Sequence, residues 1–169
     1  MKRFKSKVLG FSDVRTANST ELFKRANAEW ESGRNKGAFT LFLKAAEEGQ
    51  PSAQHNVGYF FDEGIGTRKS QDRALYWYKK AWRNDRQSGT CINIAKLYES
   101  KNNSRLAIAW WMKAIAQNDG DAALDLAKHY LRRNRERNAS KAKSLLRQVS
   151  SARSTGGART EAAKLLKKL

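Results

Sequence analysis

The chain has 169 residues, of which 40% are hydrophobic, and it carries a formal net charge of +18. Its hydrophobic content excludes a chain that is disordered by composition, and its length allows one domain with a core of its own. The single cysteine, Cys91, excludes an intrachain disulfide, and the presence of only one proline is typical of an all-helical chain.

The chain begins with a stretch that predicts no regular structure and then changes character. Residues 1–18 are basic and polar with little periodicity, and we expect a flexible basic leader there. From Ser19 onward, apolar residues recur at i, i+3, i+4 and i+7, which is the pattern of a helix with one buried face. Short runs of small or charged residues interrupt this pattern and end each helix. The interruptions fall at Gly33, Gly49, Gly64–Gly66, Ser100–Asn103, Asn118–Gly120, Asn134–Asn138 and Ser150–Gly157.

The best-formed stretch is Ala53–Ala81. Its first half places apolar residues at i, i+4, i+7 and i+8, and its second half repeats that spacing. Gly64 and Gly66 separate the two halves, because glycine adopts left-handed backbone angles at low cost. The stretch therefore predicts a helix–turn–helix hairpin. Its apolar residues are Ala53, Val57, Phe60 and Phe61, then Ala74, Tyr78, Ala81 and Trp82.

The same hairpin recurs in weaker form along the chain, in steps of 32 to 37 residues. Small residues return at fixed places, which indicates that two helix backbones cross closely there. A bulky residue follows the second-helix alanine by three positions. One hairpin cannot bury its own apolar face, so neighbouring hairpins must stack. The first-helix triplet is Asn56–Gly58, Asn93–Ala95, Asp125–Ala127 and Glu161–Ala163, and the second-helix alanine is Ala38, Ala74, Ala107 and Ala142.

These patterns predict an all-α fold, namely a superhelical α/α solenoid. We expect about four helix-turn-helix repeats followed by a C-terminal capping helix. The repeats cover about residues 19–50, 51–86, 88–119 and 120–156, and the closing helix covers 158–169.

The central unit resembles the Sel-one-like repeat, a relative of the tetratricopeptide repeat. The third repeat keeps part of the pattern, including Asn93, Ala107 and Trp110, whereas the first and fourth are more degraded. The resemblance covers about residues 20–169. It implies an α/α superhelix with protein–protein adaptor roles in signalling, envelope or host-interaction settings, and it implies no catalytic chemistry. The matching residues of the central unit are Ala53, Asn56, Val57, Gly58, Phe61, Gly64, Ile65, Gly66, Asp72, Ala74 and Trp77–Ala81.

No group of residues predicts an active site. His55 and His129 form no histidine or cysteine pair at metal-binding spacing, so we predict no metal. Cys91 lies beside Ile92 in a predicted helix, where a buried inert thiol is expected. The turn at Gly64–Gly66 lacks the Gly-Lys-Ser/Thr ending and the preceding strand of a phosphate-binding loop. We therefore predict a non-enzymatic protein with no cofactor and no small-molecule substrate.

The positions of residues within the repeats indicate a binding groove. In this fold the first helix of each pair lines the concave face. The residue directly after the small residue of each first-helix triplet lies outside the core, and it is Tyr59 in the second repeat but a lysine in the later ones. Like charges that face one another repel, and an anionic ligand lowers that cost. We therefore expect an acidic protein partner. The alternative is that the charges only keep a small solenoid soluble. The candidate partner-binding residues are Tyr59, Lys96, Lys128, Arg132, Lys164 and Lys168.

A second basic feature lies within residues 128–169, which contain thirteen Lys/Arg and two Asp/Glu. The stretch of residues 132–143 is rich in arginine and lysine, which is typical of nucleic-acid-binding segments. An association with nucleic acid is therefore the alternative function. A solvated connection between two helices is the simpler explanation of this stretch. A membrane is the least favoured partner, because no exposed amphipathic anchor is evident. The alternative basic patch consists of Arg133, Arg135, Arg137, Lys141 and Lys143.

The function predicted from these features is protein binding by an adaptor, a scaffold or a cognate inhibitor of the immunity type, most simply in a bacterium. The basic N-terminus lacks an apolar run long enough for a signal peptide, and no window is long and apolar enough to cross a bilayer. A single cysteine favours a reducing compartment. We therefore expect a cytoplasmic protein, with signal-independent export as the alternative.

Overall fold

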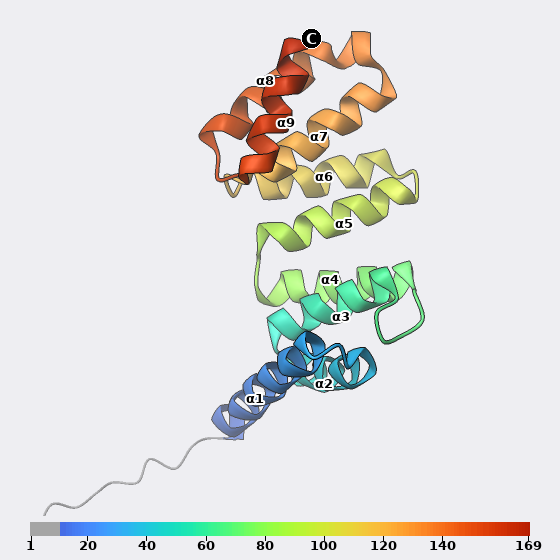
Figure 1. The fold of residues 1–169 in the computed structure, drawn as a ribbon, viewed down its shortest axis with the longest axis vertical. Helices are drawn as coiled ribbons and strands as arrows, with labels where there is room; N and C mark the ends of the chain where they lie inside the picture. Colours follow the sequence, from blue (N-terminus) through green and yellow to red (C-terminus); the bar gives the residue numbers. More distant parts are fainter. Residues whose placement is uncertain (1–10) are drawn as a thin grey trace, which may run out of the picture. The chain divides into compact units, whose positions relative to one another are not determined.

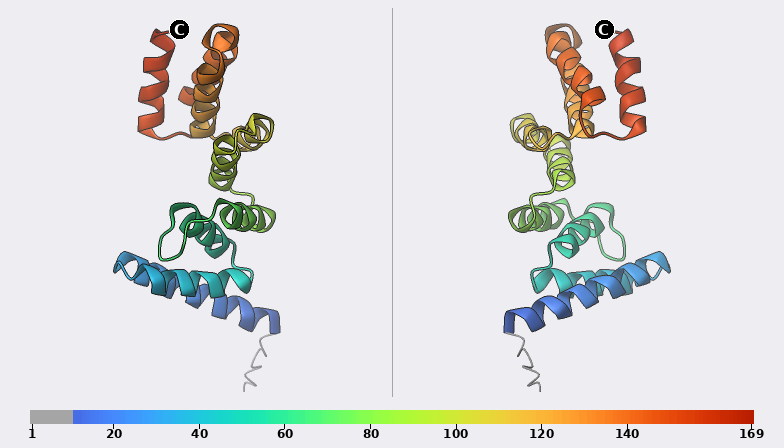
Figure 2. Two further views of the ribbon diagram at one scale, coloured as in Figure 1. Left: turned by 90° about the vertical axis from the view of Figure 1, so that its right-hand side faces the viewer. Right: turned by 90° about the vertical axis from the view of Figure 1, so that its left-hand side faces the viewer.

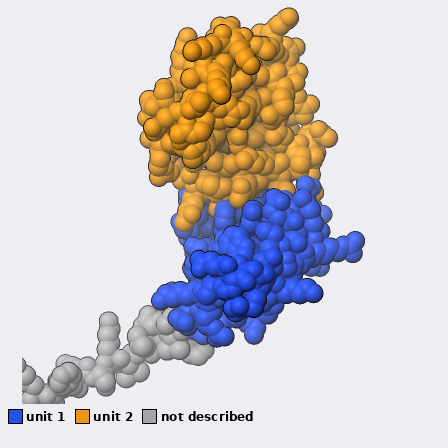
Figure 3. All heavy atoms as spheres, viewed as in Figure 1, with its two compact units in different colours: residues 1–86 blue, residues 87–169 orange. Residues whose placement is uncertain are grey.

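The structure is a computed structural model that describes residues 11–169, with side chains described from Asn18 onward. Over these residues the chain forms nine helices and no strand (Figure 1). The helices divide into two compact units, unit 1 up to Arg86 and unit 2 from Gln87 onward (Figure 3). The first ten residues of the predicted leader lie outside the described residues.

Unit 1 contains two helix pairs, and unit 2 contains two helix pairs and a closing helix (Figure 2). This order confirms the predicted all-α fold of four helix pairs followed by a closing helix. The helices of unit 1 are α1 (Phe11–Glu31), α2 (Asn35–Glu47), α3 (Pro51–Glu63) and α4 (Gln71–Asn84). The helices of unit 2 are α5 (Ser88–Ser100), α6 (Ser104–Ile115), α7 (Gly120–Arg133), α8 (Arg135–Ser151) and α9 (Gly156–Lys167).

Two helix starts differ from the prediction. Helix α1 begins at Phe11, inside the predicted leader, because residues 11–18 contain no glycine or proline that would end a helix. Helix α8 begins at Arg135, so the charged connection predicted at 134–138 is reduced to Asn134. The Asn134 side chain accepts a hydrogen bond from the backbone N–H of Arg137 at 2.9 Å. A single asparagine therefore caps α8 directly after α7 ends.

The turn between α3 and α4 has the backbone conformation that its glycines predict. Gly64 has φ +77° and Gly66 has φ +63°, both in the left-handed region that side chains with a Cβ rarely adopt. Gly64 ends α3, and Ser70 caps α4 after the turn. The glycine pair thus sets the geometry of the hairpin.

The small residues predicted at the helix crossings of the four pairs are buried as expected, whereas Ala163 in α9 is exposed. Gly58 in α3 faces Tyr78 in α4, and a Cβ atom at Gly58 would lie 2.6 Å from the tyrosine ring. A larger side chain there would force the two helices apart. The second-helix alanines Ala38, Ala74, Ala107 and Ala142 all have no exposed surface.

The most deeply buried large side chain of each pair stands four positions after this alanine, directly after the bulky residue that follows the alanine by three positions. Trp110 is half-buried, whereas Trp111 is 1% exposed. A helix turns by about 100° per residue, so the fourth residue after the alanine lies closer to its face than the third. The core residues are Phe42, Tyr78, Trp111 and Leu146.

Candidate partner-binding site

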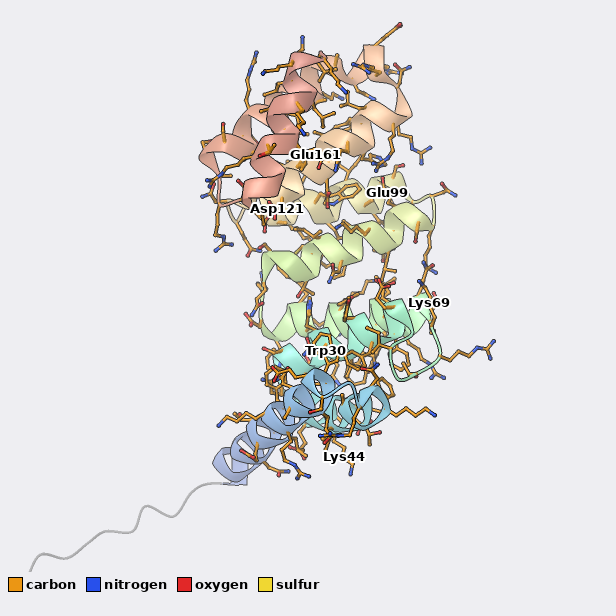
Figure 4. All side chains as sticks on the ribbon, viewed as in Figure 1. Trp30, Lys44, Lys69, Glu99, Asp121 and Glu161 are labelled. Carbon is orange, nitrogen blue, oxygen red and sulfur yellow. The ribbon has the colours of Figure 1, made fainter. Side chains whose placement is uncertain are left out.

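The six candidate residues are divided between the two units. Tyr59 lies on α3 in unit 1, and the other five lie on α5, on α7 and at the end of α9 in unit 2. The Tyr59 ring is half-buried, and its centroid lies 6.0 Å from that of Trp30, which Figure 4 labels. Trp30 also contacts Phe42 and Phe60. Aromatic rings therefore connect the first helices of unit 1.

The corresponding first helices of unit 2 are connected by ion pairs. Lys96 Nζ on α5 lies 3.2 Å from Asp125 Oδ2 on α7, and Lys128 Nζ on α7 lies 2.7 Å from Glu161 Oε1 on α9. We call these two pairs the ion-pair ladder. In each pair the carboxylate stands three residues before the next cation of the series.

The ladder changes the electrostatic argument made from the sequence. Lys96 and Lys128 were expected to face other cations, and each instead faces a carboxylate from the next first helix. Sequence reasoning missed Asp125 and Glu161 as members of the site. Both are the first residue of a repeat triplet, a position that Asn56 and Asn93 occupy in the earlier repeats. The change from asparagine to an acidic residue at this position could have identified them.

A groove of about 410 Å³ runs along the ladder. Its lining combines charged side chains with apolar side chains, and Figure 4 labels two of the carboxylates, Asp121 and Glu161. Protein–protein interfaces likewise combine apolar and polar side chains. The lining residues are Ile92, Lys96, Asp121, Leu124, Asp125, Lys128, Thr155, Gly157, Ala158 and Glu161.

Arg132 belongs to a second charged cluster, at the ends of α5 and α7. Glu99 Oε1 lies 2.6 Å from Arg132 Nη2 and 2.6 Å from His129 Nδ1. Burial raises the pKa of Glu99, but the hydrogen bonds from His129 and Arg132 outweigh it and leave that pKa lowered. Glu99, Asn102, His129, Arg132 and Arg133 line a hollow of about 630 Å³, and Figure 4 labels Glu99.

His129 is a core residue of this cluster. His129 is 2% exposed, whereas the neighbouring Tyr130 is half-buried. The imidazole packs 5.2 Å from the Trp111 ring, measured between centroids. The carboxylate of Glu99 satisfies the buried ring nitrogen Nδ1, which explains how a polar side chain occupies a core position.

Lys164 and Lys168 are exposed, and neither side chain forms an ion pair with any residue that the structure describes. Lys164 continues the series of Lys96 and Lys128 on α9. Lys168 corresponds to Arg132, because each stands four residues after the lysine of its series, Lys164 and Lys128. The residue of α7 that corresponds to Glu99 is Leu131, which cannot pair with Lys168. Positive charge is therefore uncompensated at this end of unit 2.

The alternative basic patch lies around the start of α8. Its side chains are exposed except that of Lys143, which is half-buried. Arg135 donates a hydrogen bond to the backbone carbonyl of Lys168 at 2.7 Å, and the Lys141 ammonium lies 5.6 Å from the centroid of the Tyr130 ring. Two of its five residues, Arg135 and Lys141, thus make contacts within unit 2, and Arg133 lines the hollow beside Arg132.

The residues considered for catalysis or metal binding are buried or half-buried. Cys91 is fully buried, and burial raises its pKa to about 11, so the thiol is a poor nucleophile at neutral pH. His55 packs against Tyr78 at 5.3 Å between ring centroids, and burial lowers its pKa. The described part of the chain contains no group of three His, Cys, Asp or Glu residues able to hold a metal ion. None of its helices is long and apolar enough to span a bilayer.

Paired helices that cross at small residues and repeat along the chain define a tetratricopeptide-like α solenoid. The chain belongs to the Sel1 repeat family, whose model matches residues 34–50, 51–84, 95–119 and 120–152. These four matches confirm the resemblance, which the sequence predicted over about residues 20–169 and most clearly in the central unit. Repeats of this family form protein-interaction scaffolds, which are generally non-enzymatic.

The similar proteins and structures share this repeat. Chitin synthase regulator SKT5 of Saccharomyces cerevisiae is 33% identical over 88 residues, covering 47% of this chain and 12% of that protein. A Sel1 repeat protein from Oxalobacter formigenes has a TM-score of 0.68 at 24% identity, covering 83% of this chain and 61% of that chain. The protein c5321, a protective antigen of uropathogenic Escherichia coli strains, has a TM-score of 0.70 at 19% identity.

The c5321 match covers 82% of this chain and 32% of that one. The chain therefore spans less than two thirds of each of these three proteins. At these identities the two solved structures establish the solenoid fold alone.

Proposed function

We propose that this protein is a non-enzymatic interaction module, acting as an adaptor, a scaffold or a cognate inhibitor, and that unit 2 binds an acidic segment of a partner protein. The observation that carries the proposal is the excess of positive charge toward the ends of α7 and α9. Arg132 shares one carboxylate with His129, and Lys164 and Lys168 pair with no carboxylate among the residues whose side chains are described. An acidic segment would lower the repulsion among these cations.

The ladder residues contribute to the same surface. The Lys96 side chain is 57% exposed in its pair with Asp125, so the pair is accessible to solvent and costs little to rearrange. A partner carboxylate can therefore share Lys96 or Lys128 with the resident acid. Ile92 and Leu124 supply apolar contact in the same groove. In unit 1, we propose that Tyr59 offers a separate aromatic contact.

Partner capture from the native source, with charge-reversed variants, tests the proposal. Arg132→Glu combined with Lys168→Glu should reduce the amount of captured partner at least tenfold. The matched control, Lys36→Glu combined with Lys44→Glu, reverses two exposed cations on α2 and should leave capture unchanged. Both variants should have the same helicity and the same unfolding midpoint as the unmodified chain. Undiminished capture by the unit 2 variant would contradict the proposal.

The second candidate function is binding of nucleic acid by the patch at the start of α8. The exposure of Arg133, Arg135, Arg137 and Lys141 favours it. Nucleic-acid binding should weaken steeply as salt is raised, because each phosphate contact releases a counterion. Capture that nuclease abolishes, and that depends on Arg137 and Lys141 rather than on Arg132 and Lys168, would favour this function over an acidic protein partner.

A further inference from the structure

Helix α4 in unit 1 carries Tyr76, the most exposed large apolar side chain among those that the structure describes. Tyr76 is 60% exposed, whereas its neighbour Trp77 is 8% exposed. The two ring centroids lie 5.3 Å apart, and the rings are nearly perpendicular. Contact with a buried ring therefore restrains the tyrosine, while more than half of its surface stays open to a ligand.

Three cations follow Tyr76 on the same side of the helix. Lys79, Lys80 and Arg83 stand at i+3, i+4 and i+7 from the tyrosine, a spacing that places side chains next to one another on a helix surface. The four side chains line a hollow of about 170 Å³. We call these four residues the α4 platform.

The positive charge of the α4 platform is not balanced by neighbouring acids. Lys80 Nζ lies 4.8 Å from the centroid of the Trp77 ring, a cation–π contact that holds the ammonium beside the aromatic surface. Neither Lys80 nor Arg83 forms an ion pair with any residue whose side chain the structure describes. Residues 73–84 contain four Lys/Arg and no Asp/Glu, since the two aspartates of this region stand at the helix ends. An open aromatic ring therefore lies within a local excess of positive charge.

A single-stranded nucleic acid supplies both of the groups that such a surface binds. Its bases stack on exposed aromatic rings, and its phosphates meet cations beside those rings. Stacking is tolerant of sequence, because every base has a flat face. A base inside a duplex is already stacked and paired, so it reaches a protein ring only after it leaves the duplex. The α4 platform therefore favours a single strand over a duplex.

An acidic protein segment fits the α4 platform less well than it fits unit 2. Its carboxylates can pair with the cations, but its apolar side chains would meet one ring, because the other side chains that line this hollow are cationic. The groove of unit 2 instead offers Ile92, Leu124 and Ala158 beside its charges. Protein interfaces usually bury a core of several apolar side chains. The difference in lining favours nucleic acid at α4 and a protein segment in unit 2.

We propose that the α4 platform binds single-stranded nucleic acid, with one base stacked on Tyr76 and the adjoining phosphates bound by Lys80 and Arg83. This site lies in unit 1 and is separate from the basic patch at the start of α8. The inference does not rest on the proposed function of unit 2, because it uses none of the residues assigned to the acidic protein partner.

Binding of a labelled strand to the full chain tests the inference. The probe is a fluorescein-labelled dodecamer of deoxythymidine, and anisotropy gives its affinity at several salt concentrations. Tyr76→Ala should weaken binding about tenfold through the loss of one stacked base, with the same dependence on salt. Tyr76→Phe keeps the ring and should bind as the unmodified chain does. Lys80→Gln combined with Arg83→Gln should reduce the slope of log affinity against log salt by about 1.4, since two phosphate contacts are lost.

Matched controls separate stacking from general charge and exposure. Met112→Ala removes another large apolar side chain, which is 50% exposed. Lys36→Gln combined with Lys44→Gln removes two exposed cations from α2. Neither change should alter the affinity by more than twofold. A strand of the same length made of abasic nucleotides keeps the phosphates, and its weaker binding should be the same for the unmodified chain and for Tyr76→Ala.

Three results would overturn the inference. The first is that the unmodified chain does not bind the dodecamer, or that Tyr76→Ala binds it as tightly. The second is that Arg137→Gln combined with Lys141→Gln abolishes binding while the α4 variants retain it, because the strand would then lie at α8. The third is that a labelled decaglutamate peptide binds as tightly as the dodecamer and loses this affinity with Tyr76→Ala, because the ligand of α4 would then be an acidic protein.

Discussion

Units 1 and 2 are built from the same kind of helix pair, but they join successive pairs by different interactions. In unit 1 the rings of Trp30, Tyr59 and Phe60 lie against one another between α1 and α3. In unit 2 the equivalent surface carries the ion pairs Lys96–Asp125 and Lys128–Glu161. Aromatic contacts are insensitive to salt and pH, whereas exposed ion pairs are weak and easily exchanged. Under the proposed function, we expect unit 1 to act mainly as a scaffold and unit 2 to offer the exchangeable surface.

The largest effect should come from removing an aromatic side chain from unit 1. Phe60 is fully buried, and its ring contacts those of Trp30, Phe39 and Phe42. Phe60→Ala should lower the free energy of unfolding by about 3–5 kcal/mol, through lost burial and the cavity left behind. Denaturant unfolding measures this loss, which should be the same at low and high salt. Tyr76→Ala removes a ring that is 60% exposed and should change stability by less than about 0.5 kcal/mol.

A smaller effect should follow from overpacking a helix crossing in unit 1. Gly58→Val places a side chain where a Cβ already meets the Tyr78 ring, and it should cost about 1–3 kcal/mol. Gly89→Val is the matched control, because a Cβ at Gly89 in α5 meets no atom within 4 Å. If both variants unfold at the same denaturant concentration, the assignment of Gly58 to a close crossing is wrong.

In unit 2 the stability should depend on pH through Glu99. A carboxyl whose pKa is lower in the folded state stabilises the fold above its unfolded pKa, near the ordinary value of 4.5, and loses this effect as pH falls through the folded value. Glu99→Gln should therefore lower the free energy of unfolding at pH 7 by about 1 kcal/mol, since hydrogen bonds from His129 and Arg132 lose a charged acceptor. The difference from the unmodified chain should shrink below pH 4.5 and vanish at lower pH. A constant difference from pH 7 to pH 3 would contradict this role.

The smallest effect should come from the ladder itself. Lys128→Met should cost about 0.2–1 kcal/mol at low salt, because the pair with Glu161 is partly exposed. The cost should fall further as salt screens the pair. Unfolding at two salt concentrations checks this, with Phe60→Ala as the salt-insensitive comparison from unit 1. A salt-independent loss above about 2 kcal/mol would mean that Lys128 contributes by packing and not by charge.

The sequence predicted the repeating part of the fold well, because that part follows from local pattern. Small residues at fixed intervals identified the helix crossings, and Gly64 and Gly66 identified the central turn. The start of α1 at Phe11 escaped prediction because residues 1–18 show little periodicity, and the start of α8 did so because a single asparagine can end one helix and cap the next.

The candidate site was predicted less well, since it depends on contacts between repeats. The series Lys96, Lys128 and Lys164 could be read from the repeat spacing of the sequence. The carboxylate that pairs with a lysine of this series, however, stands on a neighbouring helix, and a pattern within one repeat does not identify it. Asp125 and Glu161 were visible only as members of a core triplet. The buried state of His129 likewise depends on Glu99 in the preceding repeat. Patterns within a single repeat therefore predict candidate surface residues, whereas the ion pairs between helices are seen only in the three-dimensional structure.

The most direct test of unit 2 as the partner-binding surface is a lysine footprint. Acetylation rates are measured by mass spectrometry for the free chain and for its complex with the captured partner. Lys96, Lys128, Lys164 and Lys168 should be shielded in the complex, whereas Lys36 and Lys44 on α2 should react at unchanged rates. Shielding of Lys36 and Lys44 with undiminished reactivity at Lys164 and Lys168 would contradict the account.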